Sequence, residues 1–271
     1  MTTDTREIAG EVVALRRYPV KSMLGEDIDS VELLAAGVEG DRVAAVIDIE
    51  TGMVASAKRP TLWRELLQCS ASTADDGIRV RLPDGVVWAL DDRGVDAAVS
   101  EVLGRTVRLT TTRPPAATLA RPTPEAVIEA GVEADVPYTE LQIGDSTPGD
   151  TFVDAAPIHL FTTATLAAVG AELVRYRPNL VLDLPDSEAY AENTWAGREL
   201  VVGSATLRIL RPTQRCAVPT LAHGDLPRRT DAVRTLMQHN RVEAAGSQPC
   251  LGAYAEVVRP GRVCLGDRAS F

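Results

Sequence analysis

The sequence predicts a mainly β protein with α/β decoration, built from two β-barrel-like units. Short strand-like runs recur along the 271 residues and are separated by tight turns at close spacing. Only three segments carry an apolar stripe at helical spacing. A proline-rich stretch over residues 113–150 opens the second unit, so we expect a first unit over residues 1–112 and a second over residues 113–271.

The first unit is predicted to hold several strands and one helix. Residues 78–82 alternate apolar and basic side chains, which is the period-two pattern of a half-buried strand. The turn at 83–85 returns the chain as a hairpin partner over 86–90. Residues 95–103 carry apolar side chains on one helical face and end at Gly104, a typical helix stop. Further strands are expected at 11–18, 43–49 and 106–109.

The second unit is predicted to begin as an extended connection and to continue as hairpins with two helices. Residues 113–150 hold many prolines and small or acidic residues, so we expect little regular structure there. Thr162 or Thr163 can cap a helix that runs to residue 173, and a second helix opens at Thr230 or Asp231. Strands are expected at 179–183, 199–202 and 205–210, and a closing hairpin joins 251–258 to 262–265.

Composition limits the possible partners and the compartment. Apolar residues make up 45% and charged residues 24% of the chain, as in ordinary globular proteins. The net charge of -10 argues against nucleic acid or an anionic membrane as a partner. The first ten residues have no apolar signal-peptide core and no run is long enough to span a bilayer, so we expect a cytoplasmic protein.

Cys216 carries the most chemical information of the four cysteines. The cysteines are far apart, which argues against zinc and iron–sulfur sites, and Cys69, Cys250 and Cys264 are expected to be inert thiols. Cys216 follows a predicted strand, and Arg215 places a positive charge beside it, which favours the thiolate. A thiolate near basic residues and small hydroxyls suits a soft metal on a phosphate-bearing ligand. The alternative is a buried free thiol.

An ordered set of motifs resembles the MOSC proteins, named for the C-terminal domain of molybdenum-cofactor sulfurase, with the β-barrel domain that often precedes it. In order, the motifs are Tyr18-Pro19-Val20-Lys21-Ser22, Gly40-Asp41-Arg42, Arg177-Pro178-Asn179, Trp195, Arg215-Cys216 with Thr220, the strand 252–258 and Leu265-Gly266-Asp267. The mitochondrial amidoxime-reducing component and its bacterial relatives share this layout. The resemblance covers nearly the whole chain and identifies the units as an N-terminal MOSC β-barrel domain and a MOSC domain.

The resemblance implies a molybdenum–molybdopterin cofactor with Cys216 as metal ligand and catalytic residue. The cofactor-binding residues that it implies are Lys21, Ser22, Arg42, Lys58, Thr163, Arg177, Asn179 and Arg215. Arginine can bind phosphate bidentately, lysine acts as a point charge, and serine and asparagine offer hydrogen bonds. Lys58 departs from the Thr-x-Arg common in relatives, and a helix cap explains Thr163 equally well. Pyridoxal phosphate binding is a further family-level association.

The implied activity is the reduction of N-hydroxylated small molecules. Electrons would come from a separate reductase or electron carrier, because the chain holds no cysteine set for a cluster. Two alternatives stay open: Cys216 could carry sulfur or hand on the cofactor, or the fold could serve a metal-free biosynthetic enzyme. The departures from relatives at Lys58 and at residues 223–225 keep the last alternative open.

Other polar residues do not form a recognisable catalytic set. Asp154 and His159 are five positions apart in a strand-like segment, so they are expected on opposite faces rather than as a proton pair. His223 and His239 have no partner at an informative spacing. The sequence has no G-x-S-x-G, GxGxxG or P-loop run, which argues against hydrolase, dehydrogenase and NTPase activities.

Overall fold

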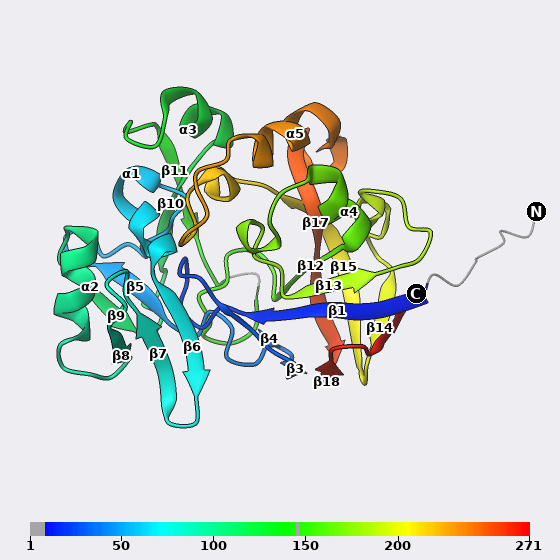
Figure 1. Ribbon diagram of the computed structural model, residues 1–271, viewed down its shortest axis with the longest axis horizontal. Helices are drawn as coiled ribbons and strands as arrows, with labels where there is room; N and C mark the ends of the chain where they lie inside the picture. The colour runs from blue at the N-terminus through cyan, green and yellow to red at the C-terminus, as the bar shows by residue number, and fades with distance from the viewer. Residues whose placement is uncertain (1–8, 145–146) are drawn as a thin grey trace, which may run out of the picture.

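The structure, a computed structural model, describes residues 9–144 and 147–271. Two lobes lie side by side and strands dominate both, which confirms the predicted mainly β class (Figure 1). Most of the polar N-terminal stretch behind the expected cytoplasmic location, residues 1–8, lies outside the described residues. Within the described ranges, every helix is too short or too polar to cross a membrane.

Seven strands close into a barrel in the lobe that contains the C-terminus. Their order is β12, β13, β1, β19, β14, β15 and β17, and pairing of β17 with β12 closes the ring. Inward side chains such as Leu200, Leu207 and Ile209 fill its interior together with Trp195, which is 1% exposed and therefore belongs to the core. The bounds are Ile158–Thr162 (β12), Leu180–Asp183 (β13), Ala9–Arg17 (β1), Arg268–Ser270 (β19), Glu199–Val202 (β14), Ala205–Gln214 (β15) and Gln248–Arg259 (β17). Two short strands, β2 (Glu26–Asp27) and β16 (Arg241–Val242), pair with β1 and β17.

Strand β1 belongs to this barrel although it is the first strand of the chain. It pairs with β13 on one side and with β19 on the other, where Ala9 lies opposite Ser270. Val12 and Leu15 are three positions apart, which would place them on opposite faces of a regular strand. A register shift between Val12 and Ala14 brings both into the barrel core. A boundary at residue 112 therefore divides the sequence but not the sheet.

The other lobe is built around a single well-formed helix, α2 (Val95–Leu103). It carries the predicted apolar face, although it starts after Gly94 and has no aspartate cap from residues 91 or 92, and the predicted stop Gly104 adopts a left-handed conformation with φ of +63°. Val99 is fully buried among the apolar side chains of the surrounding strands. These strands are β5 (Ala45–Asp48), β6 (Ser70–Ala74), β7 (Gly77–Arg81), β8 (Val87–Ala89) and β9 (Val107–Thr110), and a short helix α1 (Pro60–Trp63) precedes β6.

A small sheet joins the two ends of the chain. Strand β18 (Gly261–Cys264) pairs with β3 (Ser30–Leu34), and β3 pairs with β4 (Gly37–Val38). The closing hairpin predicted between 251–258 and 262–265 is therefore wrong, because the second strand takes β3 as its partner. Gly261, the first residue of β18, packs so closely against Ser204 that a Cβ would lie 2.6 Å from the carbonyl carbon of that residue.

The prediction of little regular structure over residues 113–150 is also wrong. The segment forms β10 (Thr118–Pro122), α3 (Pro124–Ala130) and β11 (Tyr138–Gln142), and β10 pairs with β11. Thr123 caps α3 by accepting a hydrogen bond from the backbone of Ala126. Pro124 occupies the first helical position, where a backbone N–H would have no partner within the helix, so proline is well tolerated. One of the prolines that suggested an irregular segment, Pro124, thus marks a helix start.

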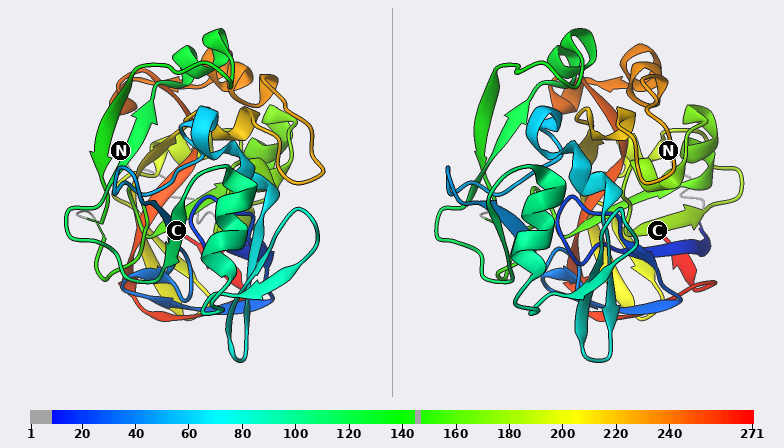
Figure 2. Two further views of the ribbon diagram at one scale, coloured as in Figure 1. Left: turned by 90° about the vertical axis from the view of Figure 1, so that its left-hand side faces the viewer. Right: turned by 60° about the vertical axis from the view of Figure 1, so that its left-hand side comes forward.

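Two further helices cover one end of the barrel. Helix α4 (Thr163–Val169) is capped by Thr162 as predicted, but it ends at the left-handed Gly170 instead of continuing to residue 173. Helix α5 (Asp231–His239) starts where predicted and buries Val233 and Leu236. Helices α3 and α5 lie near each other at the same end of the molecule (Figures 1 and 2).

Candidate cofactor site

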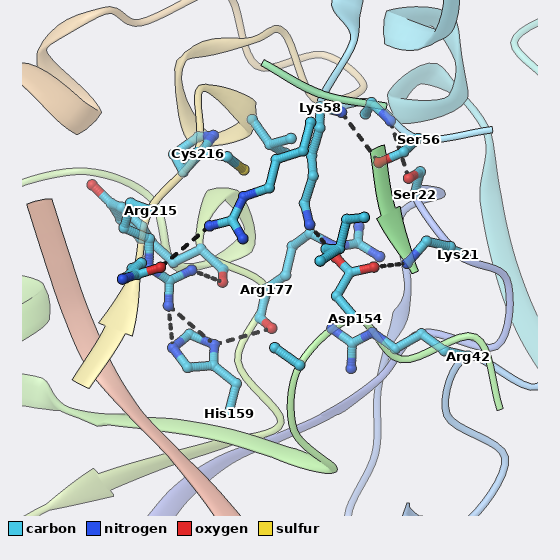
Figure 3. Close-up of a pocket in the computed structure, with 18 of the residues that line it drawn as sticks. Lys21, Ser22, Arg42, Ser56, Lys58, Asp154, His159, Arg177, Arg215 and Cys216 are labelled. Atoms are coloured by element: carbon cyan, nitrogen blue, oxygen red, sulfur yellow. Dashed lines mark hydrogen bonds and ion pairs between the residues drawn. The ribbon is translucent and has the colours of Figure 1, made fainter. Parts of the chain in front are cut away.

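A pocket lies where the two lobes meet. The space open to the centres of water molecules is about 150 Å³, about ten times what a single water needs, so the pocket has room for a ligand rather than for a single ion. Its walls come from the segment after β1, the segment before α1, β10 and β11, the segment before β12, the segment before β13, and the end of β15 (Figure 3). The lining includes Lys21, Ser22, Arg42, Ser56, Lys58, Arg121, Asp154, His159, Arg175, Tyr176, Arg177, Arg211, Gln214, Arg215, Cys216 and Tyr254.

The pocket is cationic although the chain is acidic. Eight lysine and arginine side chains line it and Asp154 is the one carboxylate among its lining residues, whereas the whole chain carries a net charge of -10. Lys21 and Lys58 are also the only two lysines of the sequence, beside 26 arginines. Such a concentration of charge against the overall sign indicates an anionic ligand.

Asp154 bridges the two lysines at the centre of the pocket (Figure 3). Its carboxylate accepts from Lys21 Nζ with one oxygen and from Lys58 Nζ with the other, the latter at 2.5 Å. Burial lowers the pKa of Lys21 to about 8, against the opposing charge of Asp154. Burial acts in the opposite sense on Asp154, but the two ammonium groups hold the pKa of that carboxyl well below its usual range. The three groups therefore carry a net charge of +1 at neutral pH.

Tyr18 lies between two arginines of the pocket wall. The guanidinium carbons of Arg42 and Arg177 lie over its ring, 4.8 and 4.3 Å from the ring centre, so both make cation–π contacts with it. Burial, with the nearby charge of Arg42, lowers the pKa of Arg177 to about 10. Arg42 binds Asp41, and Arg177 donates to the carbonyl oxygen of Met23 at 2.6 Å.

Three pocket residues adopt a backbone conformation that non-glycine residues rarely occupy. The φ angles of Ser22, Arg42 and Arg177 are +66°, +50° and +55°. Each such residue costs about 1–3 kcal/mol and persists only where its surroundings impose it. Their gathering in one pocket indicates that the fold sustains local strain to direct these side chains.

His159 fixes the orientation of Arg215. Burial and the charge of Arg215 hold the pKa of His159 well below its usual value, so the ring is neutral. Arg215 Nη2 can only donate, and it contacts His159 Nε2, so that nitrogen accepts and the ring proton sits on Nδ1. Nδ1 lies 3.3 Å from the carbonyl oxygen of Arg177, to which it donates. Arg215 also donates to the carbonyl oxygens of Tyr176 at 2.9 Å and Leu251 at 2.7 Å, while its buried Nε has no partner among the described residues.

Cys216 presents a free, partly buried thiol to the pocket. Strand β15 runs to Gln214, four residues beyond the predicted end, and a 3-10 turn over Val218–Thr220 follows, so the thiol sits on a short rigid corner. The thiol lies within electrostatic range of Lys58. The other cysteines lie outside the pocket lining. Burial raises the pKa of Cys69 to about 12 and that of Cys250 to about 11, and Cys264 is partly buried on β18.

Most of the predicted site residues converge on this pocket. Lys21, Ser22, Arg42, Lys58, Arg177, Arg215 and Cys216 all line it. Asn179 lies behind the lining, where its side-chain oxygen accepts from the backbone of His159 at 3.1 Å and from Arg42 at 3.4 Å, so it positions other groups. The prediction for Thr163 is wrong: it starts α4 and its hydroxyl donates to Asp183, away from the pocket.

The central carboxylate and several cations of the pocket stand outside the sequence motifs. Asp154 and His159 both line the pocket, bound to the lysines and to Arg215 respectively, which agrees with the expectation that they do not form a pair. Asp154 precedes β12, so no strand alternation governs its direction. Arg121 and Arg211 stand in none of the motifs, so nothing in the sequence sets them apart from the other arginines. The scarcity of lysine is the one feature of the sequence that could have indicated Lys58 and its neighbours, because both lysines of the chain pair with the same carboxylate.

Gly252 allows the barrel wall to approach His159. Its φ is +73°, and a Cβ there would lie 2.4 Å from the carbonyl oxygen of Leu160 and 2.9 Å from His159 Nε2. We expect Gly252→Ala to lower the free energy of unfolding by about 2–4 kcal/mol, because backbone strain and a clash with backbone act together. The matched control is Gly85→Ala, which has φ of +85° but no atom within 4 Å and should cost about 1 kcal/mol. Urea denaturation of both variants measures the difference, and equal losses would contradict the role of close packing.

Comparisons with known proteins identify both parts of the chain. Residues 9–119 match the MOSC N-terminal beta barrel domain, and residues 148–270 match the MOSC domain. Among solved structures, the chain is similar to the YUAD protein from Bacillus subtilis, with 11% identity, 98% of this chain and 96% of that chain covered, and a TM-score of 0.41. It is also similar to YiiM from Geobacillus stearothermophilus, with 18% identity, coverage of 43% and 54%, and a TM-score of 0.29. A third similar structure is a hypothetical protein, with 10% identity, coverage of 100% and 70%, and a TM-score of 0.40. A comparison with curated proteins finds no match.

The two matches together span most of the chain and include the segments that build the pocket. Lys21, Arg42 and Lys58 come from the first matched segment, and Arg177 and Cys216 from the second. Within the described residues, no group of three or more histidine, cysteine or acidic side chains could hold a metal ion by itself. The chain is a MOSC-domain protein with an N-terminal MOSC β-barrel domain.

Proposed function

We propose that this protein is a molybdenum-cofactor-dependent oxidoreductase that reduces N-hydroxylated compounds in the cytoplasm, with electrons from a separate protein. The observation that carries the proposal is the free thiol of Cys216 in a cationic pocket between the two lobes. A thiolate is a soft donor that suits molybdenum, and the surrounding cations suit a phosphate-bearing pterin. The buried Nε of Arg215, which lacks a partner among the described residues, is a further donor for such a ligand.

The pocket residues would divide the work of holding the cofactor. Cys216 would ligate the metal, while Lys21, Arg42, Arg177 and Arg215 would neutralise and orient the anionic groups. When bound, the cofactor would supply the two-electron chemistry that cleaves the N–O bond. The overall reaction, R–NHOH + 2e⁻ + 2H⁺ → R–NH₂ + H₂O, also needs two protons. With its pKa near 8, Lys21 can hold and release a proton at Nζ close to neutral pH.

The arrangement of the lysines favours this cofactor over pyridoxal phosphate. Pyridoxal enzymes attach the cofactor's aldehyde to a lysine amine. Here both Lys21 and Lys58 are engaged by Asp154, and Lys21 donates a second hydrogen bond to the carbonyl oxygen of Phe152 at 2.8 Å. Neither amine is free to attach a cofactor without breaking this bridge.

Metal analysis combined with turnover tests the proposal. Protein made in a host that synthesises molybdopterin should contain about one molybdenum per chain, because one thiol lines the pocket. The same protein should reduce benzamidoxime when a reduced viologen dye supplies electrons. A metal-free protein that still turns over substrate would contradict the proposal. A persulfide on Cys216, detected by mass spectrometry without molybdenum, would instead support the sulfur-carrier function.

A further inference from the structure

Two arginines of the pocket have no evident task in holding the cofactor. Arg121 comes from β10 and Arg211 from β15, and the motifs that suggested the cofactor site include neither. Neither forms an ion pair with any carboxylate among the described residues. Both therefore bring an uncompensated positive charge to the pocket.

The surrounding groups hold these arginines in place without neutralising them. Arg121 Nη2 donates to Gln214 Oε1 at 3.3 Å, and Gln214 is itself fixed because its Nε2 donates to the carbonyl oxygen of Ala245 at 2.7 Å. The guanidinium carbon of Arg211 lies 5.5 Å from the centre of the Tyr254 ring, and Tyr254 lies opposite Arg211 across the β15–β17 pair. Neutral partners orient the two cations and leave their charge available to a ligand.

Arg121 also lies close to the proposed reacting centre. It donates to Gln214, which ends β15 two positions before Cys216, and all three residues line the pocket. An anion bound at Arg121 would therefore lie on the part of the pocket wall that also carries the thiol proposed to hold the metal.

We infer that Arg121 and Arg211, which line the same pocket together with Gln214, form a recognition site for an anionic group on the substrate. The substrate class is then N-hydroxylated compounds that also bear a carboxylate or a phosphate, with Leu141 and Tyr254 offering apolar contact to the body of the molecule. This inference rests on the proposed function for the reaction, but the selection of anions can be measured without turnover.

The kinetic test compares two substrates that differ in one charge. Wild-type protein should reduce 4-carboxybenzamidoxime with a kcat/KM at least about ten-fold above that for neutral benzamidoxime, the order expected of one charge-assisted hydrogen bond. In Arg121→Gln with Arg211→Gln, this preference should disappear through a higher KM for the carboxylate, with the kinetics of the neutral substrate retained. Arg259→Gln, which removes an exposed arginine at the end of β17, is the matched control and should keep the preference.

A binding test separates this inference from the proposed function. Calorimetric titration of the metal-free protein with 4-carboxybenzamidoxime should show binding that weakens about ten-fold or more in the double variant but not in Arg259→Gln. Charge-selective binding without turnover would reject the proposed reaction and retain the anion site. Equal kcat/KM for the two substrates, or carboxylate binding that is undetectable or unchanged in the double variant, would overturn the inference. A phosphate-bearing analogue in the same titration distinguishes a carboxylate from a phosphate preference.

Discussion

Replacing Cys216 by alanine is expected to abolish retention of molybdenum and to reduce amidoxime turnover at least about 100-fold. Loss of an outer-shell partner of a metal site already costs 10–100-fold, and Cys216 would be the direct protein ligand. The thiol is only partly buried, at the edge of a small apolar cluster that includes Val218 and Leu221, so the fold should tolerate the loss. Molybdenum content, turnover and melting temperature of the purified variant measure the three effects separately.

Cys264→Ala is the matched control for this experiment. Its thiol is also partly buried, but it lies on β18, where Cys264 pairs with Ser30 of β3, outside the pocket lining. The control should retain metal and turnover. Full metal content in Cys216→Ala would show that the cofactor is held without a thiolate and would remove the main support for the assignment.

Replacing Asp154 by asparagine is expected to lower the free energy of unfolding by about 3–5 kcal/mol at neutral pH. Removing one partner of a buried ion pair leaves an uncompensated buried charge, which typically lowers the free energy of unfolding by about 3–5 kcal/mol. Here both Lys21 and Lys58 lose Asp154 as their partner. Water cannot replace it easily, because the two side chains are only 6% and 13% exposed. Asp150→Asn in the same segment is the control, because the Asp150 side chain is 97% exposed and its loss should cost less than about 1 kcal/mol.

The loss caused by Asp154→Asn should shrink as the pH rises. The folded-state pKa of Lys21 is lowered to about 8 from an unfolded value of 10.5, so between these values the unfolded chain binds more protons and stability rises with pH. Without Asp154 the folded-state pKa of Lys21 falls further. Lys21 of the variant therefore loses its unpaired charge at a lower pH, and the variant begins to regain stability there. Asp154 itself has a depressed folded pKa, so its contribution is present above about pH 4 and is lost only in acid. Urea denaturation at about pH 7 and about pH 9.5 measures both variants, and an equal loss at the two values would contradict charge as the cause.

The order of the sequence motifs predicted most of the site residues. It could not predict contacts between residues that are far apart in the sequence. Lys21, Arg42, Arg177 and Cys216 each stand in a short run with a fixed neighbour, so the runs could be assigned before any contact was known. Asp154 has no such run, and its role exists only because the segment before β12 passes between two lysines that precede it by 133 and 96 positions. Thr163 is also engaged by a distant partner, since its hydroxyl donates to Asp183 on β13, twenty positions away and outside the pocket.

Strand partners were the other feature that the sequence could not supply. The pattern of β18 predicted a strand, but its pairing with β3 joins segments more than 200 positions apart, which no local periodicity encodes. The same applies to β1, whose register shift at Val12 reverses the face that simple alternation would assign. By contrast, the apolar face and the end of α2 were predicted correctly, because helical spacing and a glycine stop are both local.

The pairing of Ala9 with Ser270 also determines when the barrel can close during translation. Translation adds roughly 5–20 residues per second, so β1 waits for tens of seconds before its last partner strand is made. During that interval its unpaired backbone is open to association with other chains. Glu11, Arg16 and Arg17 place charges along this strand, and such charges act as gatekeepers against aggregation. The barrel therefore closes only when β19 pairs with β1, and nascent chains stalled before β19 should be the most prone to aggregate.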